Sequence, residues 1–441
     1  MIYSYDQAVA QRSYFHDIMS VFGSNLAVTA SSLLIGILLS RILGAAGYGL
    51  YSSIIVVPVI VIGFTQLGIR RATMYHLASK KLPEDNIVSA VFILLLITSL
   101  LTILISGLVF IFSESGKADP FLLTCIMITI PFVLCNVFAG GIFLGKQEIL
   151  RANILNAGPT FINLIFVIFL VWILRLSVRG AFLALFLGNL CMFFFVYYII
   201  RKSYHITWKY HEGIMKSMVR LGIVFAFSIF IMLLNYRVDI ILLKKYSTLE
   251  QVGLYTVAVQ IAEQLFHVPY AIETIVLTRS AASSNAQASN RTVASIMRVS
   301  FLISILLGGV VYLVVPYLVP PVFGHDFVKS VPMIRGILPG VLVIVVFRIL
   351  NSRLAGMGKP QVAIYCFIPA LIINLILNII WIPRHGGMGA VWATNASYSA
   401  GCLIFLFAYA WKVKMPVSEI FRYRKSDFYF FRNIKKRILS H

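Results

Sequence analysis

Long apolar runs alternate with short polar segments along the whole chain. Each run is about 20 residues long, which is the helix length needed to cross roughly 30 Å of hydrocarbon. The runs centre on residues 20–40, 49–67, 87–112, 121–144, 152–174, 180–200, 219–243, 253–277, 296–319, 333–351, 361–382 and 389–411. Barrel strands would instead give alternating segments of roughly 10 residues. The pattern predicts an all-α integral membrane protein with about twelve transmembrane helices.

The order of sequence features repeats between the two halves of the chain. The segment "GYGLYSSIIVV" from Gly47 matches "QVGLYTVAVQI" from Gln251, and "LGKQEILRANILNAGPTFINLIF" from Leu144 matches "MGKPQVAIYCFIPALIINLIL" from Met357. Six predicted helices separate the matching segments, so both halves have the same orientation in the membrane. The repeat predicts two six-helix lobes related by a pseudo-two-fold axis along the membrane normal.

The basic residues lie mostly between the runs, and they predict the orientation of the chain. With the N-terminus inside, 26 of the 37 Lys and Arg residues fall on the inner side and 9 on the outer side. By the positive-inside rule, both termini are expected in the cytoplasm. The predicted organisation is a cytoplasmic N-terminal segment 1–17, a lobe 18–200, a basic cytoplasmic linker 201–218, a lobe 219–411 and a basic cytoplasmic tail 412–441. This placement favours the lipid bilayer as the partner of the net charge of +22, and no nucleic acid is expected.

Two charged residues, Arg237 and Asp239, lie inside the seventh predicted helix. Each ionised side chain at the centre of a spanning helix costs roughly 2.5 to 3.5 kcal/mol on insertion scales, which predicts a function for both. Residues two positions apart point to nearly opposite sides of a helix, so these two are not expected to pair. Asp239 is expected to share a face with Asn235. Arg237 is expected either to extend to the outer membrane surface or to bind an anion.

The eighth predicted helix carries a polar stripe. Its members recur at intervals of three and four residues and are Gln260, Glu263, Gln264, His267, Tyr270 and Thr274. Glu263 is about ten residues, or roughly 15 Å, from the outer end, which places its carboxylate near the bilayer middle. Carboxylates at that depth face protein or water and usually belong to a substrate or ion path. The stripe predicts a polar cavity, and an interhelical ion pair between Glu263 and Arg237 is the alternative interpretation.

Three further polar positions are candidates for the same cavity. Asn25 lies on a stripe of small polar residues in the first helix, which indicates either close helix packing or a cavity wall. Arg41 ends that helix where Lys245 ends the seventh, which suggests two cations at the outer mouth. Arg348 is near the inner end of the tenth helix, where extension to the membrane surface is favoured over a role in the cavity. The predicted substrate-binding residues are Arg237, Asp239, Asn235, Glu263, His267, Gln260, Tyr270, Arg41, Asn25 and Arg348.

Four segments are informative in combination. They are "SRILGAAGYGLYSS" from Ser40, "TQLGIRRATMYHLASKK" from Thr65, "YRVDIILLKKYSTLEQVGLYTVAVQIAEQ" from Tyr236 and "LAGMGKP" from Leu354. Together they resemble the O-antigen and capsule polysaccharide flippases of the multidrug/oligosaccharidyl-lipid/polysaccharide exporter superfamily, over roughly residues 15–411. The resemblance implies two lobes in a V that open alternately to either side of a bacterial or archaeal cytoplasmic membrane. It also implies a cavity, often cationic, for the diphosphate of a polyprenyl-linked oligosaccharide, whereas the charges inside this chain are concentrated in its C-terminal half.

The function that these observations predict is export of a lipid-linked oligosaccharide, coupled to a proton or sodium gradient. Arg237 would bind phosphate oxygens with its planar set of donors, and Asp239, Glu263 and His267 would take up the coupling ion. A glycan polymerase or glycosyltransferases are the expected protein partners.

Two rival functions use the same sequence features differently. A multidrug or metabolite cation antiporter on the same fold is the alternative, and it should prefer an acidic cavity without Arg237. An enzyme is not expected, because the sequence has short loops and lacks a metal-ligand cluster or a nucleophile beside a base. No cofactor is expected either.

Overall fold

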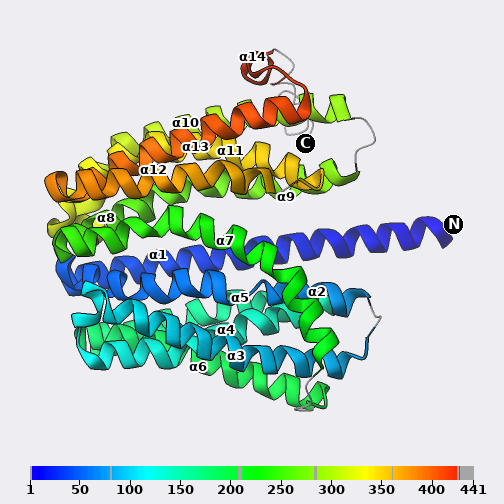
Figure 1. Ribbon diagram of the computed structural model, residues 1–441, viewed down its shortest axis with the longest axis horizontal. Coiled ribbons are helices and arrows are strands. Elements are labelled where there is room, and N and C mark those ends of the chain that lie inside the picture. The colour runs from blue at the N-terminus through cyan, green and yellow to red at the C-terminus, as the bar shows by residue number, and fades with distance from the viewer. Residues whose placement is uncertain are drawn as a thin grey trace, which may run out of the picture. The chain divides into compact units, whose positions relative to one another are not determined.

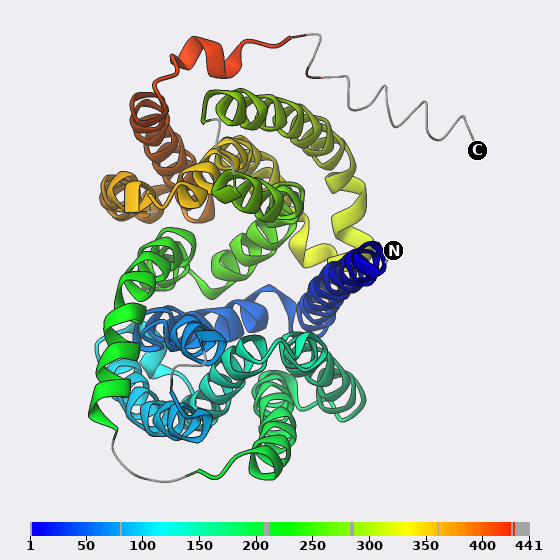
Figure 2. The same ribbon diagram turned by 90° about the vertical axis from the view of Figure 1, so that its right-hand side faces the viewer.

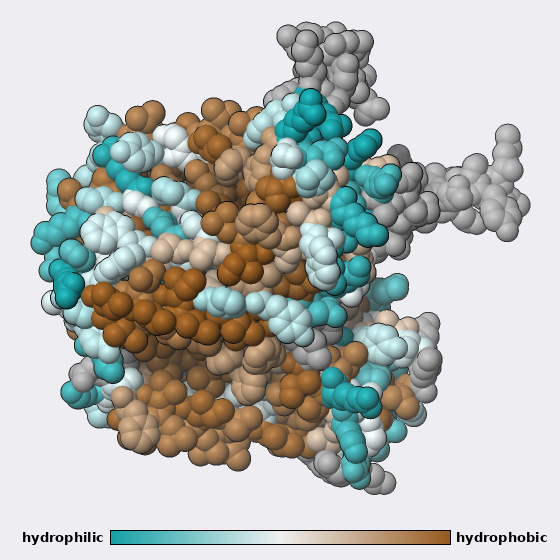
Figure 3. All heavy atoms as spheres, turned by 45° about the horizontal axis from the view of Figure 1, so that its top comes forward, coloured by the Kyte–Doolittle hydropathy of each residue, from teal (hydrophilic) through white to brown (hydrophobic). Residues whose placement is uncertain are grey.

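The computed structural model describes residues 2–79, 82–206, 211–282, 286–359, 361–424 and 427. These residues form helices joined by short connections, with no strand among them. Nine helical stretches in the described part of the chain are long and apolar enough to span a membrane. On the face shown in Figure 3, hydrophobic side chains cover the middle of the helices and hydrophilic side chains gather towards their ends. The predicted all-α, multi-pass membrane fold is confirmed.

The described chain divides into two compact units, Met1–Leu233 and Leu234–His441. Each of the twelve predicted runs lies in a helix, or in consecutive helical segments, of one of these units or at their junction in α7. The lobe boundaries given above stay a prediction, and part of the predicted linker, residues 207–210, and most of the tail lie outside the described residues.

The first unit is a bundle of long helices packed side by side (Figures 1 and 2). Its elements are α1 (Ile2–Thr65), α2 (Ile69–Ser79), α3 (Glu84–Ile111), η1 (Glu114–Lys117), α4 (Pro120–Gly145), α5 (Ile149–Val167), the π-helical turn η2 (Ile168–Ile173), α6 (Ser177–Ser203) and the first part of α7 (Glu212–Tyr246). The first two predicted spans are both part of α1, which is interrupted at Gly44, where φ is 66°. The predicted N-terminal segment 1–17 is helical from Ile2 onwards and continues into α1.

A tight glycine contact fixes the turn between α1 and α2. Gly68 has φ of +60°, and a Cβ there would lie 2.4 Å from the carbonyl oxygen of Gly222 on α7. Only glycine allows both the left-handed backbone and this approach. The first part of α7 therefore packs directly on the α1–α2 turn, and Met218 on α7 joins the apolar core that Leu134 and Phe138 of α4 form beside it.

The second unit contains the remaining helices, of which α11, α12 and α13 lie next to one another (Figure 1). Its elements are the last part of α7, α8 (Leu249–Ala262), η3 (Glu263–Phe266), α9 (His267–Ala282), α10 (Ala286–Phe323), η4 (His325–Ser330), α11 (Val331–Gly356), α12 (Gln361–His385), α13 (Gly387–Val413) and α14 (Val417–Phe421). Buried rings of Phe347, Phe367 and Phe405 meet in its core, with centroids of neighbouring rings 4.4 and 4.8 Å apart.

The sequence pattern predicted one continuous helix for the eighth span, but the structure divides it into three segments. The α-helix α8 ends at Ala262, a single 3₁₀ turn covers Glu263–Phe266, and α9 starts at His267. A short 3₁₀ stretch inside a long helix often marks a functional hinge or local strain. The interruption falls on Glu263 and so changes the direction in which the residues of the polar stripe point.

A buried ion pair attaches the C-terminal segment to α10. Arg298 on α10 donates from Nε and Nη2 to the two carboxylate oxygens of Asp427 at 2.8 and 2.7 Å, and from Nη1 to the carbonyl oxygen of Ile420 at 2.8 Å. Both side chains of the pair are almost fully buried, 4% and 2% exposed. Burial raises the pKa of Asp427, but hydrogen bonds from Arg298, Ser295 and the Arg424 N–H outweigh it and lower this pKa to about 2.

Asp427→Asn is expected to destabilise the protein, because it leaves the buried Arg298 without its counter-ion. The cost of breaking such a pair is about 3 to 5 kcal/mol, measured as a lower unfolding temperature of the purified protein in detergent. Because the pKa of Asp427 is lowered in the folded state, its stabilisation is present above the ordinary carboxyl pKa and is lost as pH falls towards about 2. Glu250→Gln is the control, since the Glu250–Lys329 pair is exposed and should contribute at most about 1 kcal/mol. Equal effects of the two substitutions would contradict a structural role for the buried pair.

Candidate functional site

An ion pair joins α7 to the start of η3 inside the second unit. Arg237 Nη2 lies 3.0 Å from Glu263 Oε2, and the two side chains are 32% and 24% exposed. The guanidinium therefore does not extend to a membrane surface; it is neutralised by a carboxylate that comes from the interruption between α8 and α9. The structure thus shows the interhelical ion pair between Arg237 and Glu263 that the sequence analysis gave as the alternative interpretation. Both partners keep part of their surface open, so the pair can exchange its contacts with a ligand.

A second ion pair of the same kind lies on α9 and α11. Arg348 donates to both carboxylate oxygens of Glu273, through Nε and, at 3.2 Å, through Nη2. Its guanidinium also covers the Tyr270 ring, 3.9 Å from the centroid, and lies 5.3 Å from the Phe266 centroid. Only 9% of the Arg348 side chain is exposed. The expectation that Arg348 extends to the membrane surface is wrong, because Glu273 supplies a counter-ion within the helix bundle.

Asp239 lies in a fully buried polar cluster of four helices. The Tyr255 hydroxyl donates to Oδ2 at 2.6 Å, Asn378 Nδ2 donates to Oδ1 at 2.6 Å, and the Thr394 hydroxyl is 2.7 Å from Oδ2. Asn378 also donates to Asn374 Oδ1 at 3.0 Å. Neutral donors from α8, α12 and α13 thus solvate the carboxylate in place of water. Among the described residues, the amide oxygen of Asn378 is buried with no hydrogen-bond partner.

Asn235, one turn before Asp239 on α7, is fully buried as well. Its Nδ2 donates to the carbonyl oxygen of Phe367 at 3.3 Å, and its Oδ1 accepts from the Ser397 hydroxyl at 3.4 Å. Asn235 connects α7 to α12 and α13, and it is not open to a large ligand. The neighbouring Tyr236 packs between the rings of Phe266 and Tyr398, and its hydroxyl is buried with no partner in the described part of the chain.

The polar stripe of α8 and α9 is only partly open. His267 and Tyr270 are exposed with ring centroids 6.3 Å apart, whereas Gln260 is half-buried and its carbonyl oxygen accepts from Gln264 Nε2 at 2.8 Å. Glu273 extends the stripe by one more position on the same face of α9, three residues after Tyr270. The open part of the stripe therefore lies on α9.

The two candidates of the first unit occupy different surroundings. Asn25 is exposed on α1 and accepts from Asn156 Nδ2 of α5 at 3.0 Å, in a row of contacts that includes Ser24 and Asn153. This row supports the helix-packing interpretation of the first polar stripe. Arg41 is exposed on α1, three residues before the interruption at Gly44.

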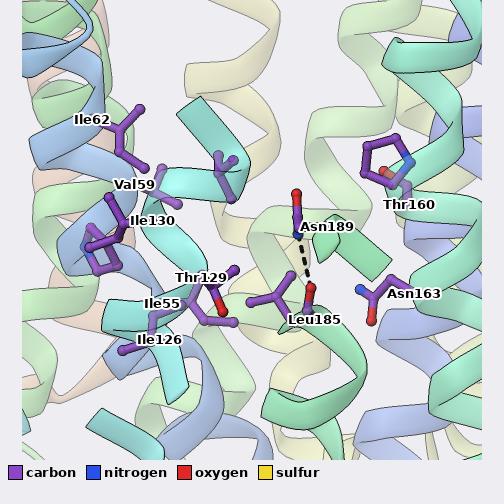
Figure 4. Close-up of a pocket in the computed structure, with 13 residues that line it drawn as sticks. Ile55, Val59, Ile62, Ile126, Thr129, Ile130, Thr160, Asn163, Leu185 and Asn189 are labelled. Carbon is purple, nitrogen blue, oxygen red and sulfur yellow. Dashed lines mark hydrogen bonds between the residues drawn. The ribbon is translucent and has the colours of Figure 1, made fainter. Parts of the chain in front are cut away.

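The first unit also has a cavity of about 260 Å³ between α1, α4, α5 and α6. Figure 4 shows apolar side chains on one side and the asparagines on the other. Asn189 donates from Nδ2 to the carbonyl oxygen of Leu185 at 2.9 Å and accepts from Asn136 at 3.3 Å. Asn163 Oδ1 is buried without a partner among the described residues. The lining residues are Ile55, Pro58, Val59, Ile62, Ile126, Thr129, Ile130, Val133, Pro159, Thr160, Asn163, Leu185 and Asn189.

The sequence repeat relates the two polar interiors. Asn163 and Asn374 occupy the same place in the matching "INLI" segments, and both are buried in their units. The offset of 204 residues that aligns Gly49 with Gly253 aligns Asp239 with Ile35. The lining residues of the first unit's cavity include no carboxylate, whereas in the second unit Asn378 connects the buried Asp239 to the equivalent asparagine, Asn374.

Four functional candidates were missed by the sequence prediction. Glu273 is a charge inside an apolar run three residues after Tyr270, so the spacing of the stripe was sufficient to find it. Asn378 follows Asn374 by one turn, which is a detectable polar pair. Tyr255 and Thr394 are common residue types in membrane helices, and only the packing of α8 and α13 against α7 connects them to Asp239.

Several solved structures have a fold similar to that of this chain. No curated protein sequence matches this chain. Lipid II flippase MurJ in an inward closed conformation has a TM-score of 0.73 and 16% identity, covering 96% of each chain. An inward-facing multidrug resistance MATE family transporter of the MOP superfamily has a TM-score of 0.75 and 14% identity, covering 88% of this chain and 94% of that one. A MOP superfamily transporter from Pyrococcus furiosus, described as having a binding pocket of reverse polarity, has a TM-score of 0.63 and 15% identity over 92% and 95%.

These likenesses show the two-lobe fold of the MOP superfamily. The polysaccharide biosynthesis protein family matches residues 15–271, more than half of the chain. The predicted resemblance is confirmed: the chain belongs to the polysaccharide biosynthesis protein family.

Proposed function

We propose that this chain moves a lipid-linked oligosaccharide, anionic at its polyprenyl diphosphate, across the cytoplasmic membrane by alternating access. Family membership supports a role in polysaccharide biosynthesis, and the similar structures include a lipid II flippase. Such a substrate needs a polar path for its sugars, a cation for its phosphates and lateral contact with lipid for its tail. Because the known relatives are transporters, catalysis is not part of the proposal.

The observation that carries the proposal is the partly exposed Arg237, 32% of whose side chain is open, within the apolar run of α7. A guanidinium presents paired donors that match phosphate oxygens, and in a site of low dielectric each charge-assisted hydrogen bond is strong. Arg237 is available for this because its carboxylate partner among the described residues, Glu263, is itself partly exposed. A diphosphate can replace Glu263 as the partner of Arg237, and Glu263 then needs a proton or a cation in exchange.

Coupling to an ion gradient has its best candidate in Asp239. Its carboxylate is buried and accepts hydrogen bonds from the neutral side chains of Tyr255, Asn378 and Thr394. A proton or a sodium ion that binds there would therefore not compete with any cation among these donors for the negative charge. Turning over the Asn378 amide would bring its unpaired oxygen beside the carboxylate and add a second oxygen ligand. His267 and Glu263, which are more open, remain the other candidates for ion uptake.

A multidrug or metabolite cation antiporter is the second candidate function. The group in the second unit contains two arginines, Arg237 and Arg348, and three acids, Asp239, Glu263 and Glu273. With all of them ionised the group is acidic by one charge, which suits a cationic substrate as well as a coupling ion. The MATE transporters among the similar structures favour the same alternative.

Arg237→Ala is expected to abolish glycan export while the protein stays folded and inserted. The substrate phosphate would lose hydrogen bonds of roughly 1.5 to 3 kcal/mol each. Arg237→Lys should recover part of the export, because the charge is kept without the planar donors. Export is measured in cells whose surface glycan depends on this protein, with membrane abundance checked for each variant. Arg335→Ala removes an exposed arginine of the same unit and is the matched control.

Two outcomes would contradict phosphate binding by Arg237. Normal export by Arg237→Leu would show that the guanidinium has no ligand. Full recovery in the double variant Arg237→Gln/Glu263→Gln, after loss in either single variant, would show that Arg237 serves only its ion pair with Glu263.

Asp239→Asn is expected to uncouple transport from the ion gradient, because the amide cannot take up a proton or hold a cation as a carboxylate does. Transport into liposomes is measured with an imposed pH gradient and, separately, with an imposed sodium gradient. The wild-type protein should respond to one of the two gradients, and the variant to neither. Asp326→Asn, at an exposed acid in η4, should behave as the wild type. A gradient response that survives in Asp239→Asn would exclude Asp239 as the coupling site.

A further inference from the structure

We propose that the open face of Tyr270 is a stacking surface for a sugar ring of the transported glycan, held in place by the Arg348–Glu273 pair. The inference rests on the proposed function and adds a contact for the glycan to the phosphate contact at Arg237. It assigns Tyr270 to substrate selection, and Arg348 and Glu273 to positioning.

Tyr270 lies on the polar face of α9. His267 precedes it by three residues and Glu273 follows it by three, so the three side chains share one side of the helix. Glu273 is 23% exposed, and an acidic side chain within an apolar run usually faces protein or water. The exposed part of Tyr270, 54% of the residue, therefore belongs to a polar face of the helix.

The ring of Tyr270 is fixed from behind. The Arg348 guanidinium covers one face at 3.9 Å from the ring centroid, and Glu273 in turn holds the guanidinium through two hydrogen bonds. The guanidinium and the ring form a stack, and 54% of the Tyr270 residue stays exposed. A ring that is already immobilised loses little conformational entropy when a ligand binds, which favours affinity.

The chemistry of this stack suits a sugar better than a phosphate. Glu273 neutralises Arg348, whose side chain is 9% exposed, so the stack offers an incoming phosphate neither a free charge nor open donors. The open surface is instead an aromatic face, which carries negative partial charge and attracts the polarised C–H groups on one side of a pyranose ring. His267, with its ring centroid 6.3 Å from that of Tyr270, is placed to hydrogen-bond a sugar hydroxyl at the edge of the platform.

The test compares two lipids that differ only in the sugar. Binding to the purified full-length protein in nanodiscs is measured for polyprenyl diphosphate alone and for polyprenyl diphosphate carrying one N-acetylhexosamine. The wild-type protein should bind the glycosylated lipid about tenfold more tightly. Tyr270→Leu should remove this preference and leave the affinity for the bare lipid unchanged, while Tyr270→Phe and Tyr270→Trp should keep it.

The positioning role of Arg348 has its own variant. Arg348→Lys keeps the charge that Glu273 needs but lacks the planar group that stacks on Tyr270. It should lower the preference for the glycosylated lipid several-fold without changing the affinity for the bare lipid. Tyr317→Leu, which removes an exposed tyrosine of α10, is the matched control and should keep the full preference.

The outcomes separate this inference from the proposed function. Binding of both lipids by the wild type with equal affinity, or a preference that survives in Tyr270→Leu, would overturn the stacking role alone. Loss of binding to both lipids in Tyr270→Leu but not in Tyr270→Phe would also overturn it, because the ring would then support the site as a whole. Binding of neither lipid by the wild type would overturn the proposed function, and the stacking role with it.

Discussion

An ionised side chain inside a membrane must be neutralised or solvated by the protein itself, and this constraint organises the second unit. Arg237 is neutralised by Glu263, Arg348 by Glu273, and Asp239 is solvated by three neutral donors. Each solution connects different helices, so the charges also determine how α7, α9, α11, α12 and α13 pack. Pairs that stay partly open can exchange a protein partner for a ligand, while the closed Asp239 cluster can change its charge only by taking up an ion. The proposed division between substrate contact and ion coupling follows from this difference in exposure.

The two units contain matching sequence segments but have different interiors. Both retain a buried asparagine in the same repeated segment, Asn163 in one and Asn374 in the other. In the first unit the asparagine lines a largely apolar cavity, and Ile35 stands where the second unit has Asp239. A neutral interior has no cost of burying charge, but it also has no means of binding an ion or a phosphate strongly. The charged chemistry of this protein is therefore concentrated in the second unit.

The sequence predicted the helices well because their signal, a long apolar run, needs no knowledge of tertiary structure. The spacing of the polar stripe predicted Glu263, His267 and Tyr270 as a group, and insertion cost made Arg237 and Asp239 candidates. The partners of these charges depend on contacts between distant helices, such as Thr394 with Asp239, which no local pattern contains. The 3₁₀ turn at Glu263 was missed because the apolar pattern runs through it unbroken. The counter-ion of Arg348 was missed because distance from a helix end says nothing about Glu273 on α9.

The central claim is that the open ion pair at Arg237 serves an anionic glycan lipid and not an organic cation. The most direct measurement reconstitutes the purified protein in liposomes and follows two substrates in parallel. One is a polyprenyl diphosphate oligosaccharide, whose sugar is detected by a lectin on the opposite side, and the other is a fluorescent organic cation. The account predicts movement of the lipid-linked glycan that depends on the protein, with no movement of the cation above empty liposomes. Transport of the cation without movement of the glycan lipid would contradict it.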